Sequence, residues 1–163
     1  MSRLSRIPIR RLPSTAPLLL LYSAAAPAHH PIGGTTPETP WQGLLSGLGH
    51  PVIGVDHLLF LLGLGTLACL TRVHVRGVLP LTGFVVTTTT GTLLHVNGIS
   101  LPWPEMLISL SLLVAGVILI MRVQPQPWML AAAASLAGIW HGFAYGEAVT
   151  GSGGTVLGAY VLG

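Results

Sequence analysis

Apolar segments of helix length alternate with short polar turns along most of this chain. A membrane-spanning helix needs about 20 predominantly apolar residues, at a rise of about 1.5 Å per residue. The pattern predicts spans at 51–70, 77–97, 104–121 and 127–146, and the start of another at 153–163. We therefore expect an all-α fold, a polytopic transmembrane bundle of about five helices with the last one incomplete.

The composition places this bundle in a lipid bilayer. Hydrophobic residues make up 51% of the sequence and charged residues only 7%, with a mean hydropathy of +0.75. A soluble domain carries about a quarter of its residues as charged side chains. The formal net charge is +3, but four arginines lie within the first eleven residues and no basic stripe follows them. Nucleic acid is therefore not an expected partner.

The N-terminus has the order of a secretory signal. A basic segment (1–11) is followed by an apolar run and by Ala-Pro-Ala at 26–28. This order predicts a signal peptide over 1–28, an extracytoplasmic linker over 29–40, rich in Pro, Gly and Thr, and a transmembrane domain over 41–163. Arginines between the spans lie in alternate loops, at 72, 76 and 122, so these loops are expected in the cytoplasm and the mature N-terminus outside.

Polar groups gather at the opposite end of the predicted helices. His57 lies near the start of the first span, His95 at the end of the second, Glu105 at the start of the third and His141 near the end of the fourth. Because successive spans alternate in direction, all four share one leaflet. Ionisable residues at membrane depth are costly, so they usually pair with each other or line a pathway.

Small residues predict which helix faces meet. Gly83, Thr87, Gly91 and His95 recur at intervals of four, and Ala134, Gly138 and Gly142 form a second such stripe beside His141. Helices in membranes pack closely along small residues. The aromatic residues Trp41, Trp103, Trp128 and Tyr145 lie near span ends, as in an interfacial aromatic belt.

A transition-metal cation is the natural partner of this constellation. Imidazole nitrogens and carboxylates bind or support first-row ions. His50 and His57 lie two turns apart on one predicted helix, about 10 Å, so we expect two stations. His50 is the outer one, and His57, His95 and His141 form the deeper one with Asp56 in support. Glu105 and Glu147 are expected as outer carboxylates that attract cations, although Glu105 also suits a helix N-terminus.

Four blocks carry a resemblance to a known family. GHPVIGVDHLL (49–59), GTLLHVNGISLP (91–102), PEMLISLSLLVAG (104–116) and HGFAYGEAVTG (141–151) occur in order. The first resembles the His-Pro-x-x-Gly-x-Asp-His signature of the HupE/UreJ nickel/cobalt permeases, and the set is closest to the cyanobacterial type. The family's signature positions fall on His50, Asp56 and His57, and its later block contributes His141 and Glu147. Many members have a second histidine where this chain has Tyr145.

The resemblance implies a permease rather than an enzyme. It would carry Ni²⁺, or Co²⁺, as transported ion without a tightly bound cofactor, through the inner or thylakoid membrane of a bacterium that builds hydrogenase or urease. Two other classes fit the residues: an intramembrane zinc-dependent hydrolase, and a haem-binding or structural membrane subunit. Homo-oligomers and association with other membrane subunits both stay open.

Overall fold

A computed structural model describes residues 35–70 and 74–163 of the chain. The predicted signal peptide and the loop that contains Arg72 lie outside these ranges. All regular structure in the described part is helical: α2 (Pro40–Ile53), α3 (Val55–Leu70), α4 (His74–Val96), α5 (Pro104–Ile120), α6 (Pro127–Glu147) and α7 (Gly154–Leu162). The all-α prediction is confirmed for this part of the chain.

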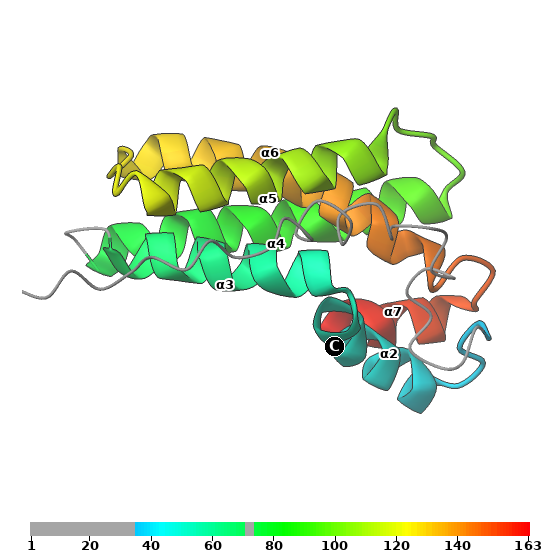
Figure 1. Cartoon of the computed structure of the whole chain (residues 1–163). Helices are drawn as coiled ribbons and strands as arrows, with labels where there is room; N and C mark the ends of the chain where they lie inside the picture. Colours follow the sequence, from blue (N-terminus) through cyan, green and yellow to red (C-terminus); the bar gives the residue numbers. More distant parts are fainter. Residues whose placement is uncertain (1–34, 71–73) are drawn as a thin grey trace, which may run out of the picture.

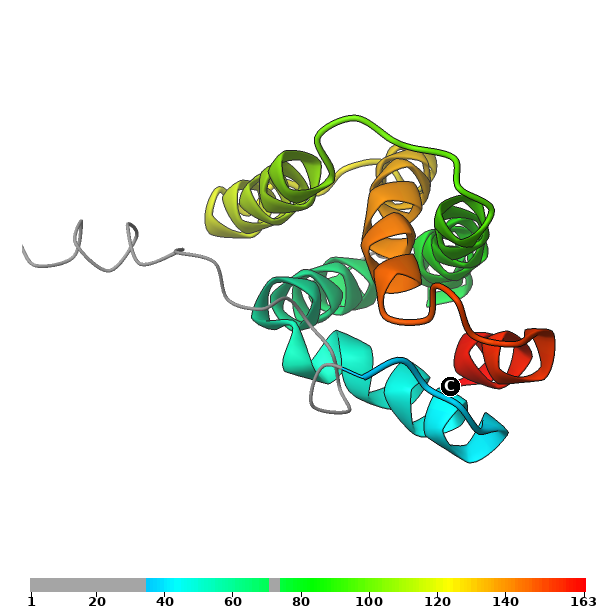
Figure 2. The same cartoon turned by 90° about the vertical axis from the view of Figure 1, so that its right-hand side faces the viewer.

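Helices α3, α4, α5 and α6 lie side by side and alternate in direction, while α2 and α7 pack together near one end of them (Figures 1 and 2). This alternation brings the start of α3 and α5 and the end of α4 and α6 to the same end. His57, His95, Glu105 and His141 therefore lie toward one end of the four helices, whereas their position in a membrane leaflet stays a prediction.

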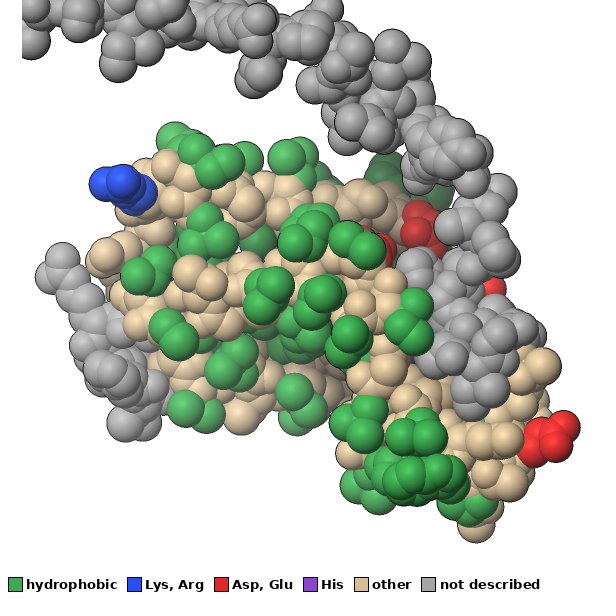
Figure 3. All heavy atoms as spheres, turned by 60° about the horizontal axis from the view of Figure 1, so that its bottom comes forward, with side chains coloured by type: hydrophobic (Ala, Val, Ile, Leu, Met, Phe, Trp, Pro, Cys, Tyr) green, Lys and Arg blue, Asp and Glu red, His purple; other side chains and the backbone are tan. Residues whose placement is uncertain are grey.

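One helix is long and apolar enough to cross a membrane by itself, over Gly77–Val96 within α4. Helices α2 and α3 satisfy the same test only as a pair, bent by 78° at their junction, and α5 is a shorter apolar helix. Apolar side chains such as Leu62, Val85 and Leu113 are at least 60% exposed. On the face drawn in Figure 3, hydrophobic side chains are spread over the long helices, with a basic side chain at one end and acidic ones near the other.

The predicted small-residue faces are where α4 and α6 meet. A methyl group on Gly91 would collide with the Ile139 carbonyl oxygen, and one on Gly142 with the Thr88 carbonyl oxygen. Across the same interface the Thr92 hydroxyl donates to the Gly142 carbonyl oxygen at 2.9 Å. Backbone packs directly on backbone here, so the prediction from the intervals of four is confirmed.

Helix α2 was not predicted, although its start carries a recognisable signal. Thr39 and Gln42 form a capping box, in which the Gln42 backbone N–H donates to Thr39 Oγ1 at 3.3 Å and the Thr39 N–H to Gln42 Oε1 at 3.2 Å. Pro40 occupies the first helical position, where its missing N–H costs nothing. Gly43 and Gly47 of α2 then pack against backbone carbonyl groups of α7.

Adding a methyl group at Gly142 should separate α4 from α6. We expect Gly142→Ala to lower the free energy of unfolding by about 1–3 kcal/mol, because neither backbone can give way. The matched control is Gly116→Ala in α5, where nothing lies within 4 Å of the added carbon, so stability should hold or rise. Thermal unfolding of the detergent-solubilised protein measures both. Equal midpoints for the two variants would contradict this packing.

Candidate functional site

The site begins at a sharp bend between α2 and α3. Gly54 leaves the helical conformation, with φ −74° and ψ 102°, and its N–H still donates to the His50 carbonyl at 3.1 Å. The next helix starts at once, since the Leu58 N–H donates to the Gly54 carbonyl at 2.9 Å. A side chain at position 54 would lie 2.6 Å from Cδ2 of His57, so this close approach requires glycine.

This bend overturns the prediction of one continuous helix over 51–70. His50 lies in the last turn of α2, and His57 lies in the first turn of α3. Their ring centroids are only 5.7 Å apart, because the chain folds back between them. The two stations predicted from a straight helix are therefore wrong, and both histidines belong to one site.

Four buried aromatic side chains make up this site, which we call the histidine cluster: His50, His57, His141 and Tyr145. Their exposures are 1%, 1%, 0% and 8%. Tyr145 lies against both histidines of the bend, with ring centroids 4.7 Å from His50 and 4.6 Å from His57. Its assignment to an interfacial belt is therefore wrong, whereas Trp41, Trp103 and Trp128 are each at least 66% exposed.

Hydrogen bonds tie the cluster across three helices. His57 Nδ1 of α3 lies 2.8 Å from His141 Nδ1 of α6. His141 Nε2 lies 3.0 Å from Oγ of Ser111 in α5. Ser111 was not singled out from the sequence. The sequence feature that could have identified Ser111 is a hydroxyl inside the apolar run of α5, where a polar group needs a partner.

Phenylalanine and tyrosine side chains hold these groups in place. Phe60 and Phe84 pack against His141, with ring centroids at 4.4 and 5.6 Å, Phe60 tilted and Phe84 edge-on. The Tyr160 hydroxyl of α7 donates to the Tyr145 carbonyl at 2.8 Å. The Tyr145 hydroxyl itself has no hydrogen-bond partner within 35–70 and 74–163. The cluster thus contains a buried oxygen that no described residue bonds.

The other predicted site residues lie around the cluster or apart from it. Asp56 is half-buried, and its Oδ1 accepts from the His57 backbone N–H at 2.9 Å. His95 is half-buried with its ring 4.4 Å from Phe143, and Glu105 and Glu147 are exposed. Across the described ranges, no three His, Cys, Asp or Glu side chains are arranged to hold a metal ion together. Their role in metal binding therefore stays a prediction.

A chamber of about 230 Å³ reaches the cluster from the side of α4 and α7. Five of its lining residues carry a hydroxyl group: Thr88, Thr89, Thr92, Tyr145 and Tyr160. Thr88 and Thr89 donate their hydroxyl hydrogens to carbonyl groups of their own helix, Phe84 and Val85. Each threonine oxygen therefore retains only acceptor capacity for anything in the chamber.

Two tyrosine variants test this description of the site. Tyr145→Phe removes a buried hydroxyl that has no partner among the described residues, so we expect the free energy of unfolding to stay equal or rise. Tyr160→Phe removes a made hydrogen bond and should lower it by about 1 kcal/mol. Thermal or denaturant unfolding in detergent distinguishes them. A greater loss for Tyr145→Phe than for Tyr160→Phe would show that the Tyr145 hydroxyl is bonded.

A family model and a curated relative both relate this chain to the same family. Residues 17–163 match the family model described as HupE / UreJ protein. The chain is 30% identical to "Protein HupE" of Rhizobium leguminosarum bv. viciae over 105 aligned residues. The aligned region covers 64% of this chain. The chain spans about half (54%) of the length of that relative. No solved structure matches the chain.

Proposed function

This chain belongs to the HupE/UreJ family, and from that premise we propose that it is a membrane permease for Ni²⁺, with Co²⁺ as the alternative cargo. The family is associated with nickel and cobalt uptake for hydrogenase and urease. The observation that supports the proposal best is the convergence of His50, His57 and His141 from three helices at one end of the bundle. Neutral imidazole is a preferred ligand of Ni²⁺.

The permease requires that more than one helix crosses the bilayer. We propose that α3 to α6 all do so, and that α2 lies across the end of the bundle, because it meets α3 at 78°. Two features support this: the exposed apolar side chains along the long helices, and the direct backbone packing of α4 on α6. Glycine-mediated contacts of this kind are typical of helices in lipid.

The proposed route starts at the end where the carboxylates lie. Glu105 and Glu147 are exposed there, and they would attract a hydrated cation. The chamber beside Tyr145 then offers hydroxyl oxygens that accept hydrogen bonds from the water around the ion. At its inner end the ion exchanges water for imidazole at the histidine cluster, with the carboxylate of Asp56 at the side of His57.

Uptake of labelled Ni²⁺ into cells that express the chain tests the proposal. Wild-type protein should show saturable uptake with Co²⁺ as competitor, and His57→Ala should reduce uptake at least tenfold, since it removes a ring from the cluster. His74→Ala is the matched control, because α4 begins with His74 at the opposite end of the bundle. It should retain uptake at comparable membrane levels.

His95 provides a second test of the site. The sequence assigns it to the metal site, whereas its only ring contact within the described ranges is Phe143. We expect His95→Ala to reduce Ni²⁺ uptake much less than His57→Ala. Equal losses at both positions would return His95 to the ligand set. Loss in His74→Ala with none in His57→Ala would contradict the proposed permeation site.

A further inference from the structure

The hydrogen bonds between Ser111, His141 and His57 form a chain whose direction can be worked out. Ser111 has one hydroxyl hydrogen, and it donates this hydrogen to the Ile108 carbonyl one turn earlier in α5, at 2.7 Å. The Ser111 oxygen must then accept at its other contact. Nε2 of His141, 3.0 Å away, is therefore the nitrogen that carries a hydrogen.

The tautomer of His141 determines that of His57. A neutral imidazole has one N–H and one lone pair. With its hydrogen on Nε2, His141 presents a lone pair at Nδ1, so the 2.8 Å contact requires His57 Nδ1 to donate. The lone pair of His57 then lies on Nε2, the other side of its ring.

We propose that Ser111 and His141 are positioning residues that fix the tautomer of His57, so that Nε2 of His57 is the nitrogen offered to the metal ion. This inference rests on the proposed function only for the identity of the cargo. It changes the role of His141, which the sequence assigns as a ligand, because both of its nitrogens are engaged in the chain. A ligand histidine commonly has its second ring nitrogen held by such a partner.

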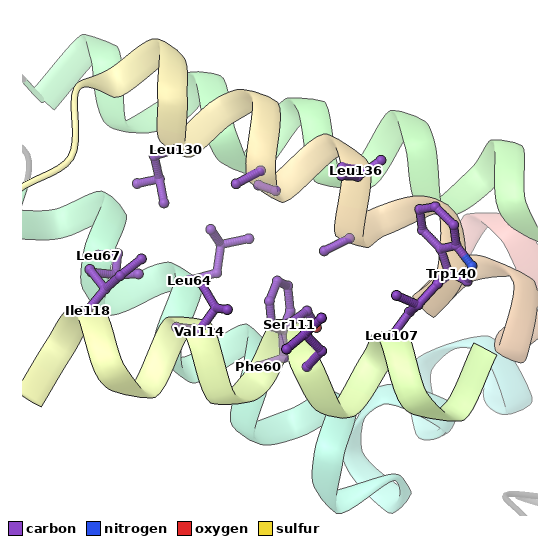
Figure 4. Close-up of a pocket in the computed structure, with 15 residues that line it drawn as sticks. Phe60, Leu64, Leu67, Leu107, Ser111, Val114, Ile118, Leu130, Leu136 and Trp140 are labelled. Carbon is purple, nitrogen blue, oxygen red and sulfur yellow. The ribbon is translucent and has the colours of Figure 1, made fainter. Parts of the chain in front are cut away.

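The surroundings of Ser111 make its hydroxyl hard to replace. Ser111 lines an apolar groove of about 240 Å³ between α3, α5 and α6, among side chains such as Leu107, Val114 and Leu136 (Figure 4). The other polar side chain in the lining is Trp140, whose indole N–H can only donate. An ordered water needs two to four polar partners, which this apolar lining does not supply, so water does not substitute for the missing oxygen.

Removing the Ser111 hydroxyl should therefore switch the tautomers of both His141 and His57. In Ser111→Ala the Nε2–H of His141 would face the apolar groove, and an unpaired buried donor is costly. The alternative tautomer of His141 places its hydrogen on Nδ1 and donates it to His57 Nδ1. The hydrogen of His57 then moves to Nε2, which removes the lone pair that the metal ion needs.

Nitrogen-15 NMR of the metal-free, histidine-labelled full chain in detergent tests this directly, with the His57 signals assigned by His57→Gln. Wild-type protein should carry the His57 hydrogen on Nδ1, and Ser111→Ala should move it to Nε2. Ser109→Ala is the matched control, because Ser109 is exposed on the same helix. A wild-type His57 with its hydrogen on Nε2, or an unchanged tautomer in Ser111→Ala, overturns the proposal.

Ni²⁺ uptake supplies the functional counterpart. Ser111→Ala should raise the half-saturating Ni²⁺ concentration about 10- to 100-fold, the usual effect of losing a group that orients a ligand, and Ser111→Thr should restore it. In a His141→Ala background, Ser111→Ala should have no further effect, because the chain is already broken. An additive loss in that background would contradict the positioning role. Absence of wild-type uptake alongside the expected NMR shift would contradict only the proposed permease function.

Discussion

The hydrogen bond between His57 and His141 is the contact on which the site depends. It joins the first turn of α3 to the end of α6 in a region that is nearly inaccessible to solvent. Buried polar groups are costly unless paired, so this bond fixes how α3 docks on the α4–α6 pair. The bend at Gly54 then determines where α2 leaves, and with it the position of His50. The bend at Gly54 and the hydrogen bond between His57 and His141 thus bring residues of three separate helices into one site.

Periodicity alone predicted the helices from α4 onward, the small-residue faces and the end at which polar groups lie. These features follow from local rules: length, apolar content and an interval of four. The bend at Gly54 was missed because a proline and a glycine within an apolar run can also continue a helix, and the choice depends on tertiary packing. The roles of Tyr145 and Ser111 were missed for a related reason. A tyrosine near a span end, or a serine within an apolar run, is compatible with either surface or core, and only the neighbouring helices decide which one applies.

The geometry also bears on the other functions compatible with the sequence. A haem held by two histidines places the iron between the two ligating nitrogens, on opposite faces of the macrocycle. His57 and His141 instead bond to each other through nitrogens 2.8 Å apart, which leaves no room between them. A catalytic zinc site requires three protein ligands and an open position. The described residues hold no such group of three, and this finding applies equally to Ni²⁺, so it does not distinguish the hydrolase from the permease.

The contact between α4 and α6 has a consequence for how this protein can move. Side chains can change rotamer and let two helices slide, but carbonyl groups packed against Gly91 and Gly142 have no such freedom. The α4–α6 pair therefore behaves as a single rigid body. In the proposed permease, any alternation between outward and inward access must come from the helices around this pair. The junction between α2 and α3 is suited to this, because a single non-helical residue separates the two helices and can act as a hinge against a fixed frame.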